Sequence, residues 1–395
     1  GASFSGDYNT AELGGSMSAS YALLNSTSGD HGRYTISGNL DSGRMAIHMR
    51  ESDDAVITIT DTGSVTGGAN EVGDPDDAAG VILFDSVSGD ENTLINHGSI
   101  TAERNLSTGV YVAVVDAEFT DEEPGYFVNK SGVLNFHNYG SVHGDVYLGA
   151  GDDLYDGAGG FITSTSKIYM GRGDDVAIGG SGRERIYGGD GDDSIDGGAD
   201  KDRIYDGEDD DIVDGGAGND YFRVGGGVDR FFGGDGNDDI SYYDSSNGVT
   251  LDLEANSASR SWASNDHIED FESASGSKTG NDRIYGTSIS NTVKTYGGED
   301  KLYGGDANDV MYGGSGTNSL YGGAGNDILT GGSAADLILG EAGDDDLRGG
   351  AGNDTISGNI GDADSLEGSA GDDRLIVRGT NTGTGGPGAD TFVAK

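Results

Sequence analysis

One nine-residue unit, exemplified by residues 188–196 (GGDGDDSID), is repeated over much of the chain. Eight such units follow one another from Met170 to Ser241 and nine more from Ser277 to Ser357, with no insertion inside either run. In every unit the eighth position is apolar and the sixth is an acid or its amide. A period held in register over this length predicts a solenoid, in which each repeat packs against its neighbours.

The composition excludes several classes of protein. With 75 glycines and 3 prolines in 395 residues, the chain is too rich in glycine for an ordinary packed core and lacks the proline content of collagen. Its 70 acidic and 22 basic residues give a formal charge of -48, which would repel nucleic acid and favours cations as partners. Cysteine is absent, so hard oxygen donors remain as the metal ligands. We find no apolar run long enough to cross a bilayer.

Residues 1–147 are less acidic and contain short alternating runs, such as Val-Ile-Thr-Ile at 56–59, that indicate half-buried strands. A looser repeat, in which a strand is followed by glycine and another short strand, occurs at 59–67, 95–102 and 136–144. We expect a parallel β-helix of uneven coils, and the region resembles the right-handed β-helices of secreted passenger and adhesin proteins. A β-sandwich with the same strand content is the alternative interpretation.

The repeats divide the rest of the chain. A first block spans residues 148–241, because the segment 148–156 (LGAGDDLYD) already carries an aspartate at its sixth position. Residues 242–276 interrupt the register and predict a connector, a hairpin or short loop packed on the end of one array and the start of the next. A second block spans residues 277–395. The expected fold is all-β: an N-terminal β-helix over 1–147 that continues as one parallel β-solenoid into two repeat blocks.

The nonapeptide places little apolar surface inside the solenoid. Successive strand residues point to opposite faces, so only the eighth residue of each unit is expected in the core. One buried side chain per nine ordered residues does not offset the loss of conformational entropy, and the array should not fold unaided. The glycines permit a tight left-handed turn that directs carbonyl oxygens inward beside an aspartate. Carbonyl and carboxylate oxygens are the ligands of Ca²⁺, whose binding would then drive folding.

The aspartates at the sixth position are the candidate Ca²⁺ ligands. If one unit is half a coil, turns on the same side lie eighteen residues apart, so Asp193 should lie between Asp175 and Asp211. The full set of candidates is Asp153, Asp175, Asp193, Asp202, Asp211, Asp220, Asp229, Asp238, Asp282, Asp300, Asp309, Asp327, Asp336, Asp345, Asp354, Asp373 and Asp390.

Units such as 188–196 (GGDGDDSID), 215–223 (GGAGNDYFR) and 322–330 (GGAGNDILT) resemble the RTX (repeats-in-toxin) nonapeptide, a Ca²⁺-binding motif of parallel β-solenoids. The resemblance covers most of residues 148–393, and the interruption within them resembles the connector between RTX blocks of secreted proteins. It implies a β-roll with several Ca²⁺ ions in its turns. It also implies export by type I secretion in an unfolded state, followed by folding in extracellular calcium.

Departures from the pattern weaken particular turns. The sixth-position aspartate is replaced by Glu184, Asn291 and Asn318. The fourth-position glycine is replaced in five units, by Asp200, Asp209, Ile289, Ala307 and Ala334. Left-handed backbone suits aspartate better than isoleucine or alanine, so we expect the turn at Ile289 to be the weakest site.

Tyrosines recur at the ninth position, eighteen residues apart, as Tyr187 and Tyr205 and again as Tyr285, Tyr303 and Tyr321. An exposed aromatic ladder is a candidate surface for a sugar or a protein. The alternative is cross-strand stacking that only stabilises the sheet. The six histidines show no HExxH spacing and no GxSxG nucleophile elbow occurs, so we expect no enzyme activity.

The expected function is that of a secreted, extracellular structural protein: a component of an S-layer, an adhesin or a surface filament that Ca²⁺ folds and assembles. Open strand edges predict self-association into a lattice or filament, and a cell-surface polysaccharide is a further candidate partner. The alternative is a secreted polysaccharide-active enzyme, a lyase or epimerase, in which residues 1–147 carry the activity. We expect neither a nucleic-acid partner nor a transmembrane segment.

Overall fold

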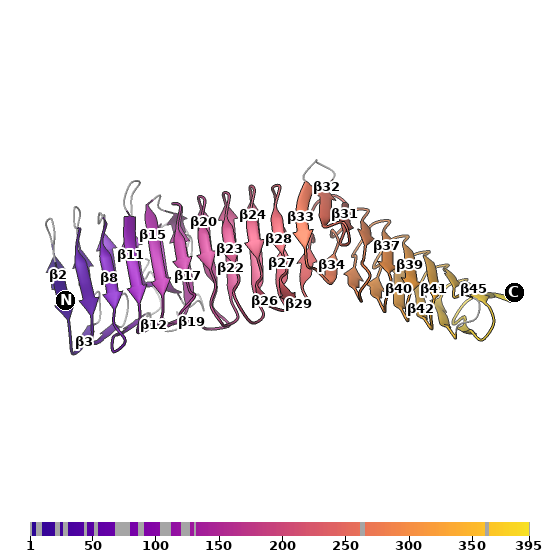
Figure 1. Ribbon diagram of the computed structural model, residues 1–395, viewed down its shortest axis with the longest axis horizontal. Coiled ribbons are helices and arrows are strands. Elements are labelled where there is room, and N and C mark those ends of the chain that lie inside the picture. Colours follow the sequence, from indigo (N-terminus) through magenta and orange to yellow (C-terminus); the bar gives the residue numbers. More distant parts are fainter. Residues whose placement is uncertain are drawn as a thin grey trace. The chain divides into compact units, whose positions relative to one another are not determined.

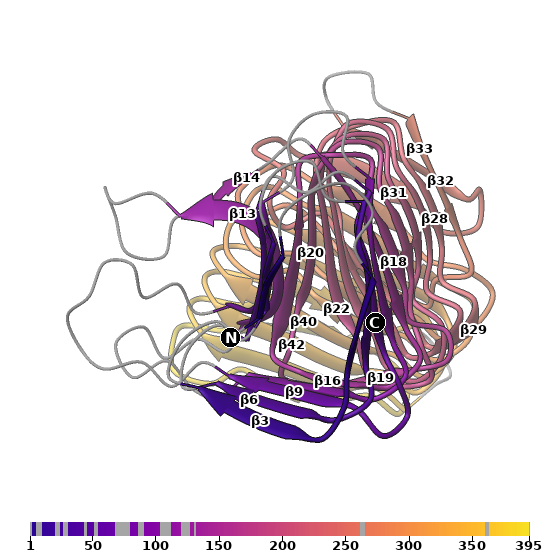
Figure 2. The ribbon, with the colours of Figure 1, turned by 90° about the vertical axis from the view of Figure 1, so that its left-hand side faces the viewer.

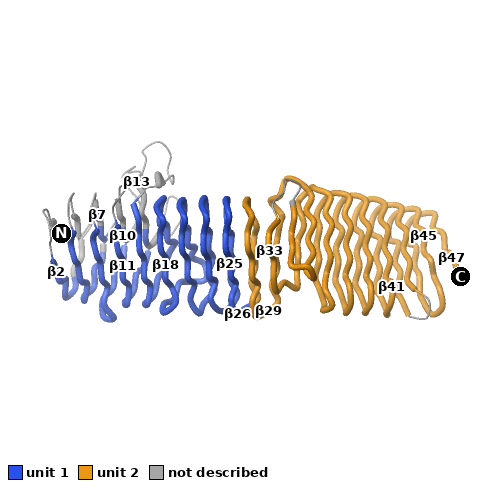
Figure 3. Tube along the Cα trace, turned by 45° about the horizontal axis from the view of Figure 1, so that its top comes forward, with its two compact units in different colours: residues 1–218 blue, residues 219–395 orange. Residues whose placement is uncertain are grey.

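The structure is a computed structural model that describes residues 2–4, 10–19, 24–26, 31–42, 46–50, 54–67, 80–85, 91–102, 112–119, 127–129, 132–260, 265–359 and 363–394. The chain forms two compact units, residues 1–218 and 219–395 (Figure 3). Every regular element in the described ranges is a β-strand, which confirms the expected all-β class. No helix among these residues is long and apolar enough to span a membrane.

Unit 1 contains three sheets, which we call A, B and C. Sheet A consists of β1 (Ala2–Phe4), β4 (Leu24–Ser26), β7 (Ile47–Arg50), β10 (Gly80–Asp85), β13 (Val112–Phe119), β17 (Asp145–Gly149), β20 (Ile168–Arg172), β22 (Arg185–Asp190) and β24 (Arg203–Glu208). Sheet B consists of β2 (Thr10–Leu13), β5 (Arg33–Ile36), β8 (Val56–Ile59), β11 (Glu91–Asn96), β15 (Val133–Asn138), β18 (Leu154–Asp156), β21 (Val176–Ile178), β23 (Ser194–Asp196) and β25 (Ile212–Asp214). Sheet C consists of β3 (Ser16–Ala19), β6 (Asn39–Ser42), β9 (Ser64–Gly67), β12 (Ser99–Ala102), β16 (Ser141–His143) and β19 (Phe161–Ile162). Two further strands of the unit are β14 (Phe127–Asn129), antiparallel to β13, and β26 (Ala217–Gly218).

The first part of unit 1 is a parallel β-helix whose coils contribute one strand to each of these sheets. Strands of successive coils pair in parallel, for example β5 with β8 in sheet B and β6 with β9 in sheet C. Figure 2 shows sheet C, from β3 to β19, as a layer distinct from the other two. The glycines of the looser sequence repeat stack at one corner, where a Cβ on Gly98 would lie 2.1 Å from the carbonyl oxygen of Gly63. The β-helix is confirmed over the described residues of 1–147, and the β-sandwich alternative is wrong.

The β-helix changes into a two-sheet roll after β19, the last strand of sheet C. The aspartates Asp153 and Asp175 are 22 residues apart across the last three-sided coil, whereas Asp175 and Asp193 are 18 residues apart. Sheet B is unbroken at this point, because Tyr155 pairs with Ala177 and Ala177 with Ile195. Within unit 1 the two repeat types therefore form one continuous solenoid, as the segment 148–156 predicts.

Unit 2 has two sheets, D and E. Sheet D consists of β27 (Tyr221–Arg223), β30 (Asp239–Ser241), β34 (Ser273–Ser275), β36 (Thr292–Lys294), β38 (Val310–Tyr312), β40 (Ile328–Ser333), β42 (Asp346–Ala351), β44 (Ser365–Ala370) and β46 (Thr382–Thr384). Sheet E consists of β28 (Arg230–Phe232), β33 (Asn265–Glu269), β32 (Ser257–Arg260), β31 (Val249–Asp252), β35 (Arg283–Tyr285), β37 (Lys301–Gly305), β39 (Ser319–Ala324), β41 (Leu337–Ala342), β43 (Thr355–Ser357), β45 (Arg374–Val377) and β47 (Thr391–Ala394). The short strand β29 (Asp235–Gly236) lies in a turn of this unit. Figure 1 shows the strands of successive coils, such as β37, β39 and β41, side by side.

The connector, residues 242–276, contributes three strands, β31, β32 and β33, to sheet E and one, β34, to sheet D. Strand β33 pairs in parallel with β28, and β32 is antiparallel to both β33 and β31. Parallel pairing then resumes between β31 and β35. The inserted strands bury Leu251 and Ala258. The connector contains the expected hairpin, and it joins the end of the first array at β28 to the start of the second at β35 by becoming part of sheet E.

The eighth-position side chains form the core of the repeat region. Each of them, from Ala177 to Ile240 and from Ile284 to Ile356, is no more than 2 % exposed. Identical or similar residues stack from coil to coil, as Ile186 does on Ile204 and Leu302 on Leu320. The sequence prediction of this core is confirmed in every unit. It is incomplete, however, because the acids of the sixth position are also buried.

Candidate metal centre

The turn before each strand fixes the sixth-position acid by a hydrogen bond between coils. In unit 1 the backbone N–H of Asp175 donates to Oδ1 of Asp193 at 2.9 Å, and that of Asp193 donates to Oδ1 of Asp211 at 2.8 Å. The same contact joins Asp153 to Asp175 at 2.7 Å. Asp193 therefore lies between Asp175 and Asp211, as the spacing predicts. Each carboxylate closes the turn of the coil before it.

Unit 2 repeats this ladder along both edges of its solenoid. The N–H groups of Asp282, Asp309 and Asp336 donate at 2.8 Å to Oδ1 of the aspartate eighteen residues further on. After residue 357 the sequence register loosens, but the ladder persists. The N–H of Asp354 donates to Asp373 at 2.9 Å, and that of Asp373 donates to Asp390 at 3.1 Å.

In many of these acids the second carboxylate oxygen is buried and has no hydrogen-bond donor among the described residues. The candidate ligands are at most 3 % exposed, except for Asp390, which is half-buried. Among the described residues, a buried second oxygen with no hydrogen-bond partner occurs in Asp175, Glu184, Asp193, Asp238, Asp282, Asp300, Asp309, Asp327, Asp336, Asp354 and Asp373. A buried carboxylate oxygen of this kind is strongly destabilising unless a proton or a cation compensates it.

Burial also raises the pKa of these carboxyl groups. Desolvation raises the pKa of Asp175 to about 8 and the pKa values of Asp193 and Asp282 to about 7. The hydrogen bond from the backbone of the preceding coil opposes this effect and does not cancel it. Burial raises the pKa values of Asp300 and Asp327 in the same way. The turns therefore favour a bound proton or cation near neutral pH.

The first-position glycine leaves a space beside this oxygen. A Cβ on Gly322 would lie 2.3 Å from Oδ2 of Asp327 and 2.5 Å from the carbonyl oxygen of Gly340 in the next coil. A Cβ on Gly188 would lie 2.3 Å from Oδ2 of Asp193. Carboxylate and carbonyl oxygens thus surround a space that any side chain at this position would fill. An all-oxygen donor set with a negative charge fits Ca²⁺.

Sequence reasoning missed acids that lie outside the strict register. The N–H of Asp229 donates to Oδ1 of Asp266 at 3.2 Å, and that of Asp345 donates to Oδ1 of Asp364 at 3.1 Å. Asp266 and Asp364 each precede a core residue by two positions, which is the spacing of the sixth and eighth positions in a regular unit. That local signal would have found them without the nine-residue period. A further buried acid, Asp206, replaces the first-position glycine, and its carboxylate lies within 4.8 Å of that of Asp211.

Four of the five fourth-position substitutions keep left-handed backbone, the two alanines included. The residues Asp200, Asp209, Ala307 and Ala334 adopt left-handed backbone with φ between 67° and 88°. Ile289 is not among the left-handed residues, and its turn is closed differently. There Oδ1 of Asn291 accepts hydrogen bonds from N–H and Oγ1 of Thr287, at 2.6 and 3.0 Å. This turn is closed by a side chain of its own, and the expectation that it is the weakest site stays a prediction.

Two tyrosine ladders follow the ninth positions. In unit 1 the rings of Tyr147, Tyr169, Tyr187 and Tyr205 stack with centroid distances of 4.4 to 4.7 Å. In unit 2 Tyr285, Tyr303 and Tyr321 stack at 4.8 and 4.9 Å. The rings cover one another's faces, which favours the stabilising role over a surface for a stacked sugar.

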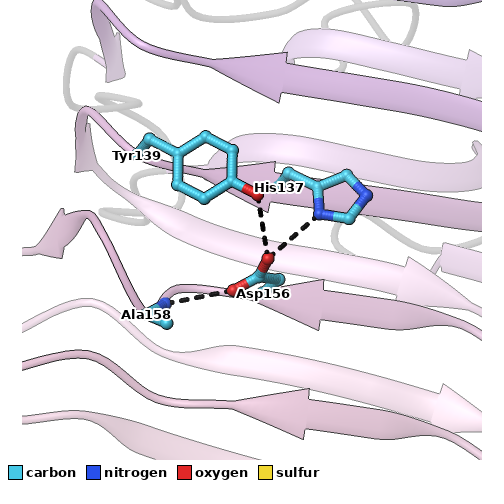
Figure 4. Close-up of polar contacts among 4 residues, drawn as sticks. All are labelled: His137, Tyr139, Asp156 and Ala158. Carbon is cyan, nitrogen blue, oxygen red and sulfur yellow. Dashed lines mark hydrogen bonds and ion pairs between the residues drawn. The ribbon is translucent and has the colours of Figure 1, made fainter.

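The β-helix of unit 1 carries a separate polar cluster on the outer face of sheet B (Figure 4). Oδ2 of Asp156 accepts hydrogen bonds from the Tyr139 hydroxyl and faces Nδ1 of His137, each at 3.1 Å. The bond to Asp156 raises the pKa of the Tyr139 phenol. Desolvation acts to raise the pKa of Asp156, but bonds from His137, the Ala158 amide and Tyr139 lower it overall. The ring of Tyr139 also stacks on His97, which borders a cavity of about 400 Å³ with Thr60, Asp61 and Thr62.

Comparison with protein families gives a match to the repeat region. The family described as "RTX calcium-binding nonapeptide repeat (4 copies)" matches residues 169–204 and 205–240, and in overlapping segments residues 278–375. No curated protein matches the chain. The matched segments contain most of the ladder of buried carboxylates.

Proposed function

Because residues 169–240 and 278–375 are RTX calcium-binding nonapeptide repeats, we propose that the protein is a calcium-dependent structural protein of a cell surface. In this role, as an S-layer component, an adhesin or a surface filament, its solenoid is folded by several Ca²⁺ ions held in the turns. The residues that would hold them are the sixth-position aspartates and the carbonyl groups of the neighbouring glycines. Bound Ca²⁺ would supply the positive charge that the buried carboxylates lack.

The observation that carries this proposal is the row of buried carboxylate oxygens without donors. Asp309 and Asp327 illustrate it: Oδ1 of Asp327 accepts the N–H of Asp309, while Oδ2 of each has no partner among the described residues. Repeated from coil to coil, this arrangement makes the folded state depend on a cation. A calcium titration followed by circular dichroism tests it directly.

The proposed location is outside the cell, after export by type I secretion. At low calcium the chain would stay unfolded before export. Folding without the ion would bring like charges together in the turns and bury carboxylate oxygens without a partner. Millimolar extracellular calcium would then fold it. Pulse-chase secretion with external chelator tests this step: exported but protease-sensitive chain is expected, and protease-resistant chain under chelator would contradict it.

Self-association is part of the proposed role. The outer face of sheet D in unit 2 carries exposed apolar side chains, with Tyr312 and Ile328 each 42 % exposed. They lie on the neighbouring strands β38 and β40. Electron microscopy with calcium and with EGTA tests assembly. Ordered lattices or filaments in calcium are expected, and monodisperse single molecules in millimolar calcium would count against it.

The second candidate function is a polysaccharide-active enzyme, and the cluster of His137, Tyr139 and Asp156 favours it. The carboxylate of Asp156 faces Nδ1 of His137, which is the arrangement of an acid–base pair. Incubation with alginate or pectin, with absorbance of unsaturated product as the readout, tests a lyase. Product formed by the native protein and lost in His137→Ala, but kept in the control His267→Ala, would support it. Absence of product would remove the lyase form of this alternative.

A further inference from the structure

Three positions of the carboxylate ladder in unit 2 carry an amide in place of an acid. They are Asn291, Asn318 and Asn381, all at most 8 % exposed. At two of them the amide oxygen takes the place of Oδ1. The N–H of Asp300 donates to Oδ1 of Asn318 at 3.1 Å, and that of Asp364 donates to Oδ1 of Asn381 at 3.2 Å.

The amide nitrogen differs from the oxygen that it replaces. Nδ2 of Asn318 donates to the carbonyl oxygen of Gly316 at 3.1 Å, and Nδ2 of Asn381 donates to that of Asn359 at 3.0 Å. Nδ2 of Asn291 donates to the carbonyl oxygen of Glu272 at 3.2 Å. In aspartate turns, such as those of Asp309 and Asp336, the corresponding atom is an oxygen with no partner among the described residues. The amide turns therefore satisfy internally the group that the aspartate turns leave unsatisfied.

The orientation of the amide is fixed by its neighbours. At Asn318, exchanging the oxygen and nitrogen would direct an NH₂ group at the N–H of Asp300 and an oxygen at the carbonyl of Gly316. Both contacts would then be repulsive, so only the observed assignment is consistent. Oδ1 of Asn318 accepts the N–H of Asp300 in the preceding coil. Nδ2 of Asn318 occupies the position of the second carboxylate oxygen, which would be the cation ligand in an aspartate turn.

We propose that Asn291, Asn318 and Asn381 close their turns without calcium, with the amide N–H groups in the place of the cation. This rests on the proposed function, in which Ca²⁺ occupies the aspartate turns. Asn291 belongs to the edge that contains Asp309 and Asp327, and Asn318 to the edge that contains Asp300 and Asp336. Each edge of unit 2 thus has at least one turn that is neutral and complete before calcium binds. The number of ions is set by the acid-to-amide ratio of the ladder and is smaller than the number of repeats.

Reciprocal substitutions in the full chain test this assignment. Asn318→Asp restores a buried oxygen without a donor, so we expect one additional Ca²⁺ per chain and a higher calcium midpoint of folding. Asp309→Asn should remove one Ca²⁺ per chain while the chain still folds in calcium. Asn326→Asp is the matched control, because Asn326 is exposed and only one residue from Asp327. It makes the same charge change and should leave the ion count unaltered.

The readout is the number of calcium ions counted by native mass spectrometry, beside circular dichroism during titration. If the native chain binds no calcium, the proposed function fails and the inference fails with it. If the native chain binds calcium but both reciprocal variants keep its ion count, only the inference is overturned. If the Asn318→Asp variant does not fold, the Asp309→Asn variant decides the question. An unchanged number of bound calcium ions in Asp309→Asn would contradict the assignment.

Discussion

At the scale of single residues, the two oxygens of each ladder carboxylate have different roles. Oδ1 of Asp309 accepts the N–H of Asn291 at 2.7 Å, which holds two coils in register. Its Oδ2 faces the space beside Gly304, where a Cβ would lie 2.3 Å from it. An aspartate and the glycine five residues before it therefore form one unit of the candidate site. The aspartate supplies charge, and the glycine supplies room.

Gly322→Ala tests the need for this room. The new Cβ would meet Oδ2 of Asp327 and the carbonyl of Gly340, so overpacking should cost about 1–3 kcal/mol. We expect a lower thermal midpoint in calcium and the loss of one bound ion. Gly182→Ala is the control, because a Cβ there has no neighbour closer than 3.5 Å. Equal effects of the two substitutions would refute the proposed space.

The raised pKa values predict how pH acts on the calcium-free chain. Unfolded aspartate has a pKa near 3.9, whereas burial raises the pKa of Asp175 to about 8 and that of Asp193 to about 7. These groups stabilise the calcium-free fold at low pH, and that stabilisation is lost as pH rises through about 7 to 8. Without calcium, we expect more strand signal by circular dichroism at about pH 5.5 than at about pH 8.5. The reverse order would contradict the burial of these acids.

At the scale of elements, the tyrosine ladders connect neighbouring parallel strands through stacked rings. Tyr303 is in the middle of the unit 2 ladder, with a ring on each side at 4.8 and 4.9 Å. Tyr303→Ala should remove both stacks and cost about 1–3 kcal/mol, measured by thermal unfolding in calcium. Tyr312→Ala, at an exposed position outside the ladder, is the control and should cost less. A similar loss at both positions would mean that stacking contributes nothing specific.

The regular repeats could be predicted from sequence, because two columns constrain each unit independently. A local pattern fixes both the core position and the ladder position. In one unit, for example, Ile195 is the core residue and Asp193 is the ladder acid. The sequence analysis did not identify Asp266 and Asp364 as ladder acids, because insertions displace them from the nine-residue period. The place of β31 and β32 within sheet E was also not predicted, because it depends on pairing between strands that are distant in the sequence. Such non-local pairing leaves little trace in a local pattern.

The sequence also underestimated how much of each acid is inside. Glycine and aspartate are typical of solvated turns, and the eighth residue alone was expected in the core. The inter-coil hydrogen bond to Oδ1 draws the side chain inward, as at Asp282 and Asp300. No single unit contains this bond, because donor and acceptor lie on different coils. The turns of Asn291 and Asn318 were predicted as weakened sites because they lack the aspartate, although Nδ2 of each donates a hydrogen bond to a backbone carbonyl oxygen.

At the scale of the whole molecule, the formal charge of -48 opposes compaction in addition to the effect of the buried carboxylate oxygens. Screening by monovalent salt acts mainly on exposed charges, with a Debye length of about 3 Å at 1 M. It does not reach the buried Oδ2 atoms. We therefore expect about 1 M NaCl to leave the calcium-free chain without its strand signal, whereas millimolar Ca²⁺ restores it. Full recovery in NaCl alone would show that general repulsion, and not the buried oxygens, prevents folding.

The most direct test of the account is circular dichroism of the full chain during a calcium titration that begins in chelator. The row of buried carboxylate oxygens predicts little strand signal at the start and a cooperative gain of it as calcium rises. Removal of calcium with EGTA should reverse the gain. A strand signal that is complete in chelator and unchanged by calcium would contradict the claim that the cation folds the solenoid.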